Sequence, residues 1–385
     1  MDVMDKELKV PKLRFKDDEG REFPQWEKRR LGEVALNISS GKSQKCEDGK
    51  YSLYGSTGII GNSREADYLG SKLIIARVGA CGFCRFVTEP CGISDNALVI
   101  TSNDYNYNLQ WLYYCVGIKH LERYAIGTAQ PLITGSLLKR INLLFPTLSE
   151  QRKIADFLTA YDELIDNQKK RVEVLKLRKK GLLQKIFSQE IRFKDDEGRE
   201  FPAWEERRLG DCAEINPLSV NLPKRFIYID LESVKSGRLL SYKVLTKENA
   251  PSRAQRQVLN GDILFQMVRP YQNNHLLFNE ISKLPVVAST GYSILRCNKN
   301  YSGYIYYAVQ EKNFFRDMLN SCVGATYPAI NVYSLSMLKI LLPTLPEQRK
   351  IADFLSVADH QITLEEKRLD TMRLIKKALL QQLFV

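Results

Sequence analysis

Several patterns that mark enzymes and membrane proteins are missing from this sequence. It contains neither the phosphate-binding loop G-x-x-x-x-G-K-[ST] nor the dinucleotide-binding turn G-x-G-x-x-G. It also has no run of about 18 apolar residues, so no membrane-spanning helix is predicted. Because the first residues, MDVMDK, lack the apolar core of a signal peptide, we expect a cytoplasmic protein with no membrane contact.

Histidine and paired cysteine are also scarce, which limits metal and acid–base chemistry. His120, His275 and His360 are far apart in the sequence, and packing or surface roles are expected for them. Cys81 and Cys84 form a single C-x-x-C pair, whereas a structural zinc site needs four ligands. We therefore predict that the eight cysteines are reduced thiols and that no metal is bound.

Acidic residues are too few to balance the basic ones. The chain of 385 residues has 57 lysines and arginines against 45 aspartates and glutamates, a formal net charge of +12. This excess suggests a polyanionic partner, although charge alone does not identify one. Eight basic residues fall within 169–185, where a solvated helix face is the plain interpretation and contact with phosphates or an acidic partner is the alternative.

The most informative stretch is a helical pattern that occurs twice. PTLSEQRKIADFL, residues 146–158, returns as PTLPEQRKIADFL at residues 343–355. In both copies the threonine and the glutamate three residues later have the spacing of a capping box, which predicts a helix start. Pro346 falls in the first turn, where no intrahelical hydrogen bond is lost.

Behind each start, apolar residues recur every three or four positions over more than four heptads, which is typical of a coiled coil. The two stripes match at an offset of 197, and so do their polar interruptions, Gln168 with Glu365 and Lys179 with Lys376. Each predicted helix has about 38 residues and is roughly 57 Å long at about 1.5 Å per residue. The matched polar positions favour pairing of the two helices over two separate amphipathic helices.

A second repeat, the frame repeat, precedes each variable part of the chain. LRFKDDEGREFPQWEKRRLGE, residues 13–33, recurs at residues 191–211 with 17 of 21 positions identical, and its DDEG stretch predicts a turn. The segments between the repeats differ in sequence but share short β-type runs, helical stretches and a closing Gly-x-x-x-Pro. The clearest β-type runs are residues 73–76, 97–100, 262–265 and 292–295, and the helical stretches are 109–124 and 302–320.

This organisation resembles the specificity (S) subunit of type I restriction–modification systems. The resemblance covers nearly the whole chain from about residue 13, through the two helix starts, the Gly-x-x-x-Pro segments and the alternation of common and variable parts. It implies an α+β fold with two target recognition domains separated by two long antiparallel coiled-coil helices in pseudo-two-fold symmetry. It also implies binding of double-stranded DNA at a bipartite asymmetric site, with two methyltransferase (M) subunits on the helices and restriction (R) subunits joining the complex.

The resemblance further implies that the chain is not an enzyme and holds no cofactor. S-adenosylmethionine, Mg and ATP are expected in the partner subunits. The sequence is consistent with this, because residues 216–219, NPLS, lack the second proline of the Asn/Asp-Pro-Pro-aromatic stretch that adenine methyltransferases use. Two alternatives remain open: a coiled-coil scaffold that binds proteins without DNA readout, and a DNA methyltransferase in its own right.

Six segments are predicted from these patterns. They are an N-terminal segment with the frame repeat at 1–30, target recognition domain 1 at 31–145, spacer helix 1 at 146–190, the second frame repeat at 191–208, target recognition domain 2 at 209–342 and spacer helix 2 at 343–385. Because two nearly identical frames suit two copies of one subunit, we predict the M contacts near the helix starts. The residues are Phe157, Leu158, Tyr161, Phe354 and Leu355.

Residues suited to reading DNA gather in polar loops of both variable segments. Base readout needs Arg, Lys, Asn and Gln side chains that reach base edges, while phosphate contacts fix the register. Loop residues of these types are more often simply solvated, so the clusters count for more than single residues. The candidates are Ser40, Lys42, Gln44, Lys45, Tyr54, Ser56, Thr57, Arg77 and Gln130 in the first domain, and Arg253, Arg256, Gln266, Arg269, Tyr271, Gln272, Asn273 and Asn274 in the second.

Overall fold

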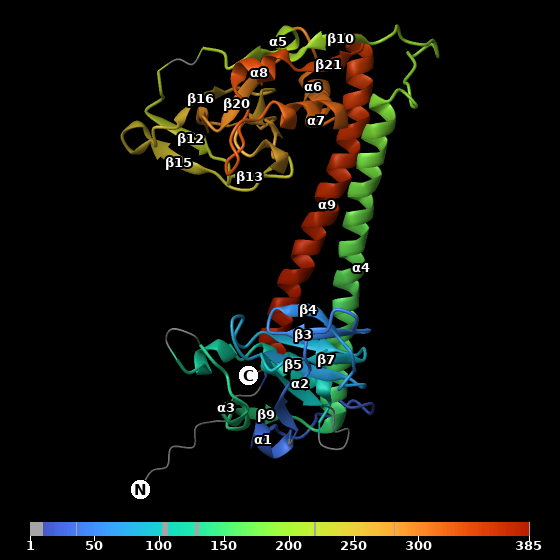
Figure 1. The fold of residues 1–385 in the computed structure, drawn as a ribbon, viewed down its shortest axis with the longest axis vertical. Coiled ribbons are helices and arrows are strands. Elements are labelled where there is room, and N and C mark those ends of the chain that lie inside the picture. Colours follow the sequence, from blue (N-terminus) through green and yellow to red (C-terminus); the bar gives the residue numbers. More distant parts are fainter. Residues whose placement is uncertain are drawn as a thin grey trace. The chain divides into compact units, whose positions relative to one another are not determined.

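The chain folds into two compact units, each of which combines one variable domain with parts of two long helices. The computed structural model describes residues 11–35, 37–101, 107–127, 131–218, 221–280 and 282–384. Unit 1 comprises Met1–Lys169 and Lys367–Val385, and unit 2 comprises Lys170–Glu366. The long helices are α4, Leu148–Phe187, and α9, Leu345–Leu383, drawn in green and red in Figure 1. Their 40 and 39 residues confirm the predicted helices.

The described part of unit 1 contains one two-stranded sheet, two larger sheets and several short helices. Its strands are β1 Glu27–Arg30, β2 Ile38–Ser40, β3 Tyr51–Gly55, β4 Gly58–Ser63, β5 Lys72–Ala76, β6 Cys84–Val87, β7 Cys91–Ile93, β8 Ala97–Thr101 and β9 Asn142–Phe145. Its short helices are α1 Leu31–Val34, α2 Leu109–Gly117, the 3-10 turn η1 Leu121–Tyr124 and α3 Gly135–Lys139. The two-stranded sheet pairs β1 with β9. One of the larger sheets has the order β2-β8-β5-β6, and the other has the order β4-β3-β7 with β3 and β7 parallel.

Unit 2 repeats this plan with additional strands. The strands are β10 Glu205–Arg208, β11 Glu214–Ile215, β12 Arg225–Ile229, β13 Val234–Lys235, β14 Arg238–Leu239, β15 Lys243–Thr246, β16 Ala254–Val258, β17 Ile263–Gln266, β18 Leu276–Leu277, β19 Val286–Ser289, β20 Tyr292–Arg296 and β21 Lys339–Leu342. The helices are α5 Leu209–Cys212, η2 Lys247–Asn249, η3 Pro270–Gln272, α6 Ser302–Ala308, α7 Lys312–Asn320 and α8 Val332–Met337. The sheet β11-β20-β17-β18 corresponds to β2-β8-β5-β6, and β15-β12-β19-β16 corresponds to β4-β3-β7 with β16 added.

The four predicted β-type runs are confirmed as β5, β8, β17 and β20, each within one residue. Strand β5 is central in its sheet, between β6 and β8, and it is buried along its whole length because both faces are covered: Leu73 and Ile75 enter one core cluster and Ile74 enters another. The predicted helical stretches are confirmed but each is interrupted. His120 has a left-handed φ of 50° between α2 and η1, and the Glu311 side chain caps the start of α7 by accepting from the N–H groups of residues 313 and 314.

The ends of the long helices belong to the cores of the domains. In unit 1, one buried cluster contains Trp26 of the frame repeat, Trp111 of α2, Ile154 of α4 and Leu383 of α9. In unit 2, the matching cluster joins the start of α9 to the end of α4 in the same way. Each domain therefore folds around the start of one long helix and the end of the other. Within the described ranges no helix is both long and apolar enough to cross a bilayer.

Candidate functional site

In unit 1, the frame repeat clasps the start of α4 through one buried carboxylate. Glu150 is fully buried and accepts hydrogen bonds from Arg14 Nε and Nη2 at 3.0 and 2.7 Å and from Trp26 Nε1 at 3.1 Å. Thr147 Oγ1 accepts from the Glu150 N–H at 3.3 Å, as a capping residue should. The predicted capping box is nevertheless wrong for the glutamate, because its carboxylate is bound by Arg14 and Trp26 instead.

Unit 2 repeats the clasp with its own residues. Glu347, also fully buried, accepts from Arg192 Nε and Nη2 and from Trp204 Nε1, each at 3.0 Å. Among the described residues, Thr344 Oγ1 has no hydrogen-bond partner, so the predicted capping box is absent here. A buried carboxylate is costly unless its oxygens are paired. The three hydrogen-bond donors belong to the frame repeat and the carboxylate belongs to the helix start. Because each segment needs the other, the two occur together in both units.

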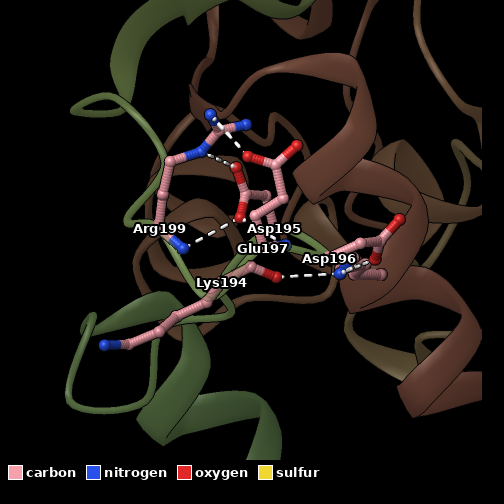
Figure 2. Close-up of polar contacts among 6 residues, drawn as sticks. Lys194, Asp195, Asp196, Glu197 and Arg199 are labelled. Carbon is pink, nitrogen blue, oxygen red and sulfur yellow. Dashed lines mark hydrogen bonds and ion pairs between the residues drawn. The ribbon is translucent and has the colours of Figure 1, made fainter.

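A tight turn in the frame repeat supplies a second contact with each helix. In Figure 2 the Asp195 carboxylate accepts from the backbone N–H and Nε of Arg199, at 2.8 and 2.7 Å, which confirms the predicted turn. Lys350 of α9 donates to the Lys194 carbonyl at 2.8 Å and pairs with Asp196 at 2.6 Å. The equivalent contacts in unit 1 involve Asp17, Arg21, Lys153, Lys16 and Asp18.

The glutamine of the shared motif ties each long helix to its variable domain. Gln151 is buried, donates to the Pro146 carbonyl at 2.9 Å and accepts from the Asn108 N–H at 2.9 Å, at the start of α2. Gln348 accepts from the Tyr301 N–H at 2.9 Å, at the start of α6. A buried amide with satisfied hydrogen bonds fixes the geometry of its neighbours. The domain helix therefore has one defined position on each long helix.

In unit 1, a polar interruption of the predicted coiled-coil stripe forms an ion pair between the two long helices. Lys376 of α9 pairs with Asp162 of α4, and the Tyr114 hydroxyl donates to the same carboxylate at 2.8 Å. The Lys376 ammonium lies 5.4 Å from the centre of the Tyr114 ring. Further along, the end of α9 shares a core with the start of α4. The two helix segments in unit 1 are therefore antiparallel.

Unit 2 contains the same triad at matching positions. Lys179 of α4 pairs with Asp359 of α9 at 2.6 Å, and the Tyr307 hydroxyl donates to Asp359 at 2.7 Å. The Lys179 ammonium lies 5.3 Å from the centre of the Tyr307 ring. Arg171 also pairs with Glu365, at 3.0 Å, so the basic stretch 169–185 partly serves helix pairing. The matched polar interruptions are thus buried or half-buried partners, and helix pairing is confirmed within each unit.

The five predicted contacts with M subunits differ in burial. Leu158 and Leu355 are fully buried in the cores of units 1 and 2, so a charge at either position would disrupt the unit itself. Tyr161 is half-buried. Phe157 and Phe354 are 37% and 43% exposed, and each packs edge to face against a phenylalanine of the frame repeat. The two exposed phenylalanines stay predicted partner contacts.

The candidate DNA contacts of the first domain lie on several strands and turns. Lys42, Gln44, Lys45 and Thr57 are exposed, and Ser40, Ser56 and Arg77 are partly buried. Tyr54 is 5% exposed, and burial together with a hydrogen bond to Glu89 raises its pKa to about 12. Its side chain therefore supports the sheet rather than forming surface. Gln130 lies outside the described residues.

The second domain gathers most of its candidates in one loop, residues 266–275, which we call the recognition loop. Gln266 is 1% exposed and is not a surface residue. Its Nε2 donates to the Val268 carbonyl and to Gln272 Oε1 at 2.8 and 2.9 Å, and its Oε1 accepts from the Asn274 N–H at 3.1 Å. Gln266 thus shapes the recognition loop from the inside.

His275 closes the recognition loop. Its ring is buried and stacks on Phe265, with 4.1 Å between ring centres and 17° between planes. Its Nδ1 accepts from the Gln266 N–H at 3.0 Å. Burial lowers the pKa of His275 to about 3, so the ring is neutral near pH 7. The expected packing role is confirmed for this histidine.

The outer face of the recognition loop presents aromatic and cationic groups. The Arg269 guanidinium lies 4.5 Å from the centre of the Tyr327 ring, and the Arg269 N–H donates to the Pro328 carbonyl at 2.8 Å. Tyr271 and Tyr327 are 49% and 61% exposed, Gln272 is exposed as well, and Arg269 is partly buried. Tyr327 was not among the sequence candidates, although it is the counterpart of Gln130 at the offset of 197 and could have been found that way.

The remaining candidates are placed apart from this face or inside the loop. Asn273 and Asn274 are partly buried, and Asn273 has a left-handed φ of 52°. Arg253 and Arg256 lie at β16, in the other sheet of the domain. Arg253 is exposed and Arg256 is partly buried.

Across the described ranges, no group of three or more His, Cys, Asp and Glu side chains is placed to hold a metal. Burial raises the pKa of the Cys84 thiol to about 12.

Comparison with known proteins identifies proteins of similar sequence. The type I restriction enzyme MjaVIII specificity subunit of Methanocaldococcus jannaschii is 24% identical over 291 residues, 71% of this chain and 68% of that protein. The MjaIX specificity subunit of the same organism is 25% identical over 307 residues, with the same two coverages.

Solved structures agree at the level of the fold. The S subunit of a type I restriction–modification system from M. genitalium matches with a TM-score of 0.63 at 18% identity, over 98% of this chain and 99% of that chain. A chain from a study of complex assembly and conformational transition of the type I system matches with a TM-score of 0.52, over 94% and 98%. The type I restriction modification DNA specificity domain matches residues 24–177 and again residues 203–373, and the chain belongs to this family.

Proposed function

We propose that this chain is the sequence-specific DNA-binding subunit of a type I restriction–modification complex, and that it directs partner subunits to a bipartite asymmetric site. One observation carries the proposal: two divergent domains are held by frames whose contacts repeat residue by residue. Glu150 and Glu347, Gln151 and Gln348 make the same hydrogen bonds in both units. The two domains differ in sequence, which suits the recognition of two different half-sites. The matching frames suit the binding of two copies of one partner subunit.

Two M subunits bind equivalent positions near the helix starts. Phe157 and Phe354 occupy matching places, with similar exposure and matching aromatic neighbours. The R subunits join this complex. S-adenosylmethionine, Mg and ATP bind to these partners, while this chain contributes recognition.

DNA is read by the exposed faces of both domains. In the second domain, Arg269 and Gln272 offer donors that suit base edges, and Tyr271 adds an aromatic surface. In the first domain, Lys42 and Lys45 are exposed and suit phosphate contacts. The net charge of +12 supports an electrostatic contribution to binding.

A domain exchange tests the proposal. Residues 31–145 are replaced by the equivalent segment of a relative, and the chain is produced with its M subunit in cells whose genome is then profiled for methylation. We expect one half of the methylated sequence to change and the other half to stay the same. The reciprocal exchange of residues 209–342 serves as the matched control and should change the other half. Changes in both halves, or in neither, would contradict the assignment.

A further inference from the structure

Where the structure describes both domains, the second contains a hairpin that the first lacks. In unit 1, β3 joins β4 through the turn Ser56–Thr57, and in unit 2 the corresponding strands β12 and β15 are joined by residues 230–242. This connection is 11 residues longer, 13 against 2, and it carries the hairpin of β13 and β14, residues 234–239, labelled at β13 in Figure 1. Long insertions in a compact domain need a reason, because ordering them costs conformational entropy.

The tip of this hairpin has a defined conformation. Ser236 and Gly237 have φ values of 50° and 75°, the left-handed pair that a tight two-residue turn requires. A Cβ on Gly237 would collide with the Tyr306 hydroxyl, so the turn lies closely against α6. Glycine at position 237 therefore meets both a backbone and a packing requirement.

One side of the hairpin contacts the recognition loop. The Ser236 N–H donates to Asn274 Oδ1 at 2.9 Å. The backbone N–H of Asn274 in turn donates to the buried Gln266 side chain at 3.1 Å. These two hydrogen bonds link the hairpin tip to the residue that shapes the recognition loop.

The other side of the hairpin contacts the long helices. Arg238 pairs with Glu366 of α9 at 2.5 Å, and the same carboxylate pairs with Lys176 of α4 at 2.5 Å. The Glu366 side chain is 15% exposed and that of Arg238 is 32% exposed, so the pair is partly shielded from solvent. A shared carboxylate between two cations is a network rather than an isolated surface pair.

The position of Glu366 makes this contact mechanically useful. The domain is already attached to α9 at Gln348 and, through the Tyr307 hydroxyl, at Asp359, which are 18 and 7 residues earlier. At about 1.5 Å per residue, Glu366 is roughly 27 Å along the helix from Gln348 and roughly 10 Å beyond Asp359. Of these three attachments the hairpin supplies the one farthest from the helix start, and a more distant attachment limits tilting of the domain on α9 more strongly.

We propose that the β13–β14 hairpin is a strut that holds the recognition loop at a fixed angle to α9, with Arg238, Glu366, Ser236 and Asn274 as positioning residues. This inference rests on the proposed function, because the angle matters only if the recognition loop reads DNA. The strut fixes the distance along DNA at which the second half-site is read. It touches no base itself.

The first test needs no DNA and measures hydrogen exchange in the full chain. In Arg238→Gln we expect the Ser236 N–H, which is bonded to Asn274, to exchange roughly two- to tenfold faster, as loss of a partly shielded ion pair predicts. Lys235→Gln removes one charge from an exposed position of the same hairpin and is the matched control. Unchanged exchange at Ser236 in Arg238→Gln would overturn the strut, whatever the chain does with DNA.

The second test profiles methylation in cells that express the chain with its M subunit. With Arg238→Gln, and separately with Gly237→Ala, we expect the sequences of both half-sites, the half-words, to stay the same. Sites whose gap is one base pair shorter or longer should also be methylated. Lys235→Gln should keep the single gap. A single unchanged gap in both variants overturns the strut, whereas failure of the unsubstituted chain to direct methylation to any bipartite site overturns the proposed function instead.

Discussion

His275 shows how one buried side chain orders an exposed loop. Its Nδ1 accepts from the Gln266 N–H and its ring stacks on Phe265, so it connects the last residue of the recognition loop to the first. A protonated ring could not accept that hydrogen bond, and a charge in this position would lack solvent. The recognition loop therefore depends on a neutral histidine.

Acid should destabilise the second unit through this residue. The folded-state pKa of about 3 lies below the ordinary value of 6.5, so the unfolded chain takes up the proton first as pH falls. The stabilisation is complete above pH 6.5 and is lost progressively between pH 6.5 and 3, about 2 kcal/mol of it between pH 7 and pH 5. Urea denaturation at several pH values measures the free energy of unfolding. We expect this loss between pH 7 and pH 5 in the unsubstituted chain and not in His275→Asn.

The control for this prediction is His120→Asn, at an exposed histidine that pairs with Glu122. It should keep the acid sensitivity of the unsubstituted chain. Equal pH dependence for His275→Asn and the unsubstituted chain would show that His275 does not carry the effect.

Residue types alone could indicate which loops matter but not which side chains face outward. Gln266 and Tyr54 have the chemistry of DNA contacts, yet tertiary packing places both inside their domains. Tyr327 lies in the closing Gly-x-x-x-Pro segment of the second domain, and its exposure and its contact with Arg269 arise from the fold. Burial of polar residues depends on partners distant in sequence, which no local pattern encodes.

At the scale of elements, the clasp between frame repeat and helix is the main structural device. It joins two segments more than a hundred residues apart through a single carboxylate with three donors. The sequence predicts both segments from their repetition, but it cannot predict that they meet. The capping-box spacing suggested a local partner for Glu150, and a distant arginine and tryptophan compete successfully because they satisfy a buried charge more fully.

Removing the charge of this carboxylate should weaken the unit. We expect Glu150→Gln to lower the free energy of unfolding by about 2 kcal/mol or more, because Arg14 and Trp26 lose a charged acceptor in a buried position. Glu347→Gln should have a similar effect on unit 2, since its contacts are the same. Denaturant unfolding followed by tryptophan fluorescence provides the measurement.

Glu22→Gln is the matched control, since Glu22 pairs with Lys16 at an exposed position of the same frame repeat. It should change the free energy of unfolding by less than about 0.5 kcal/mol. If Glu150→Gln were as mild as Glu22→Gln, the clasp would not be a significant source of stability.

At the scale of the molecule, the two units are circular permutations of one design. Unit 2 is continuous, from the end of α4 through the second domain to the start of α9, whereas unit 1 takes its helix end from the C-terminus of the chain. The triads Tyr114–Asp162–Lys376 and Tyr307–Asp359–Lys179 repeat accordingly. The offset of 197 predicted this equivalence, and the heptad stripe predicted the paired helices. The tyrosines of the triads could not be foreseen, since they belong to the variable domains.

The last prediction concerns the length of the helices. Inserting four residues between Gln168 and Val172 lengthens α4 by about 6 Å, at about 1.5 Å per residue. Because B-DNA rises about 3.4 Å per base pair, we expect the gap between half-sites to grow by one or two base pairs. Both half-words should stay the same, since neither domain is altered. Methylation profiling of cells that express the variant with its M subunit measures the gap directly.

A matched pair of variants separates helix length from helix pairing. A second insertion of four residues between Glu365 and Leu369 of α9 restores equal lengths, because the two stripes correspond at the offset of 197. The doubly lengthened chain should methylate the widened gap at least as efficiently as the singly lengthened one, since its apolar stripes can pair throughout. Efficient methylation at the original gap by the doubly lengthened chain would mean that the helices do not set the spacing.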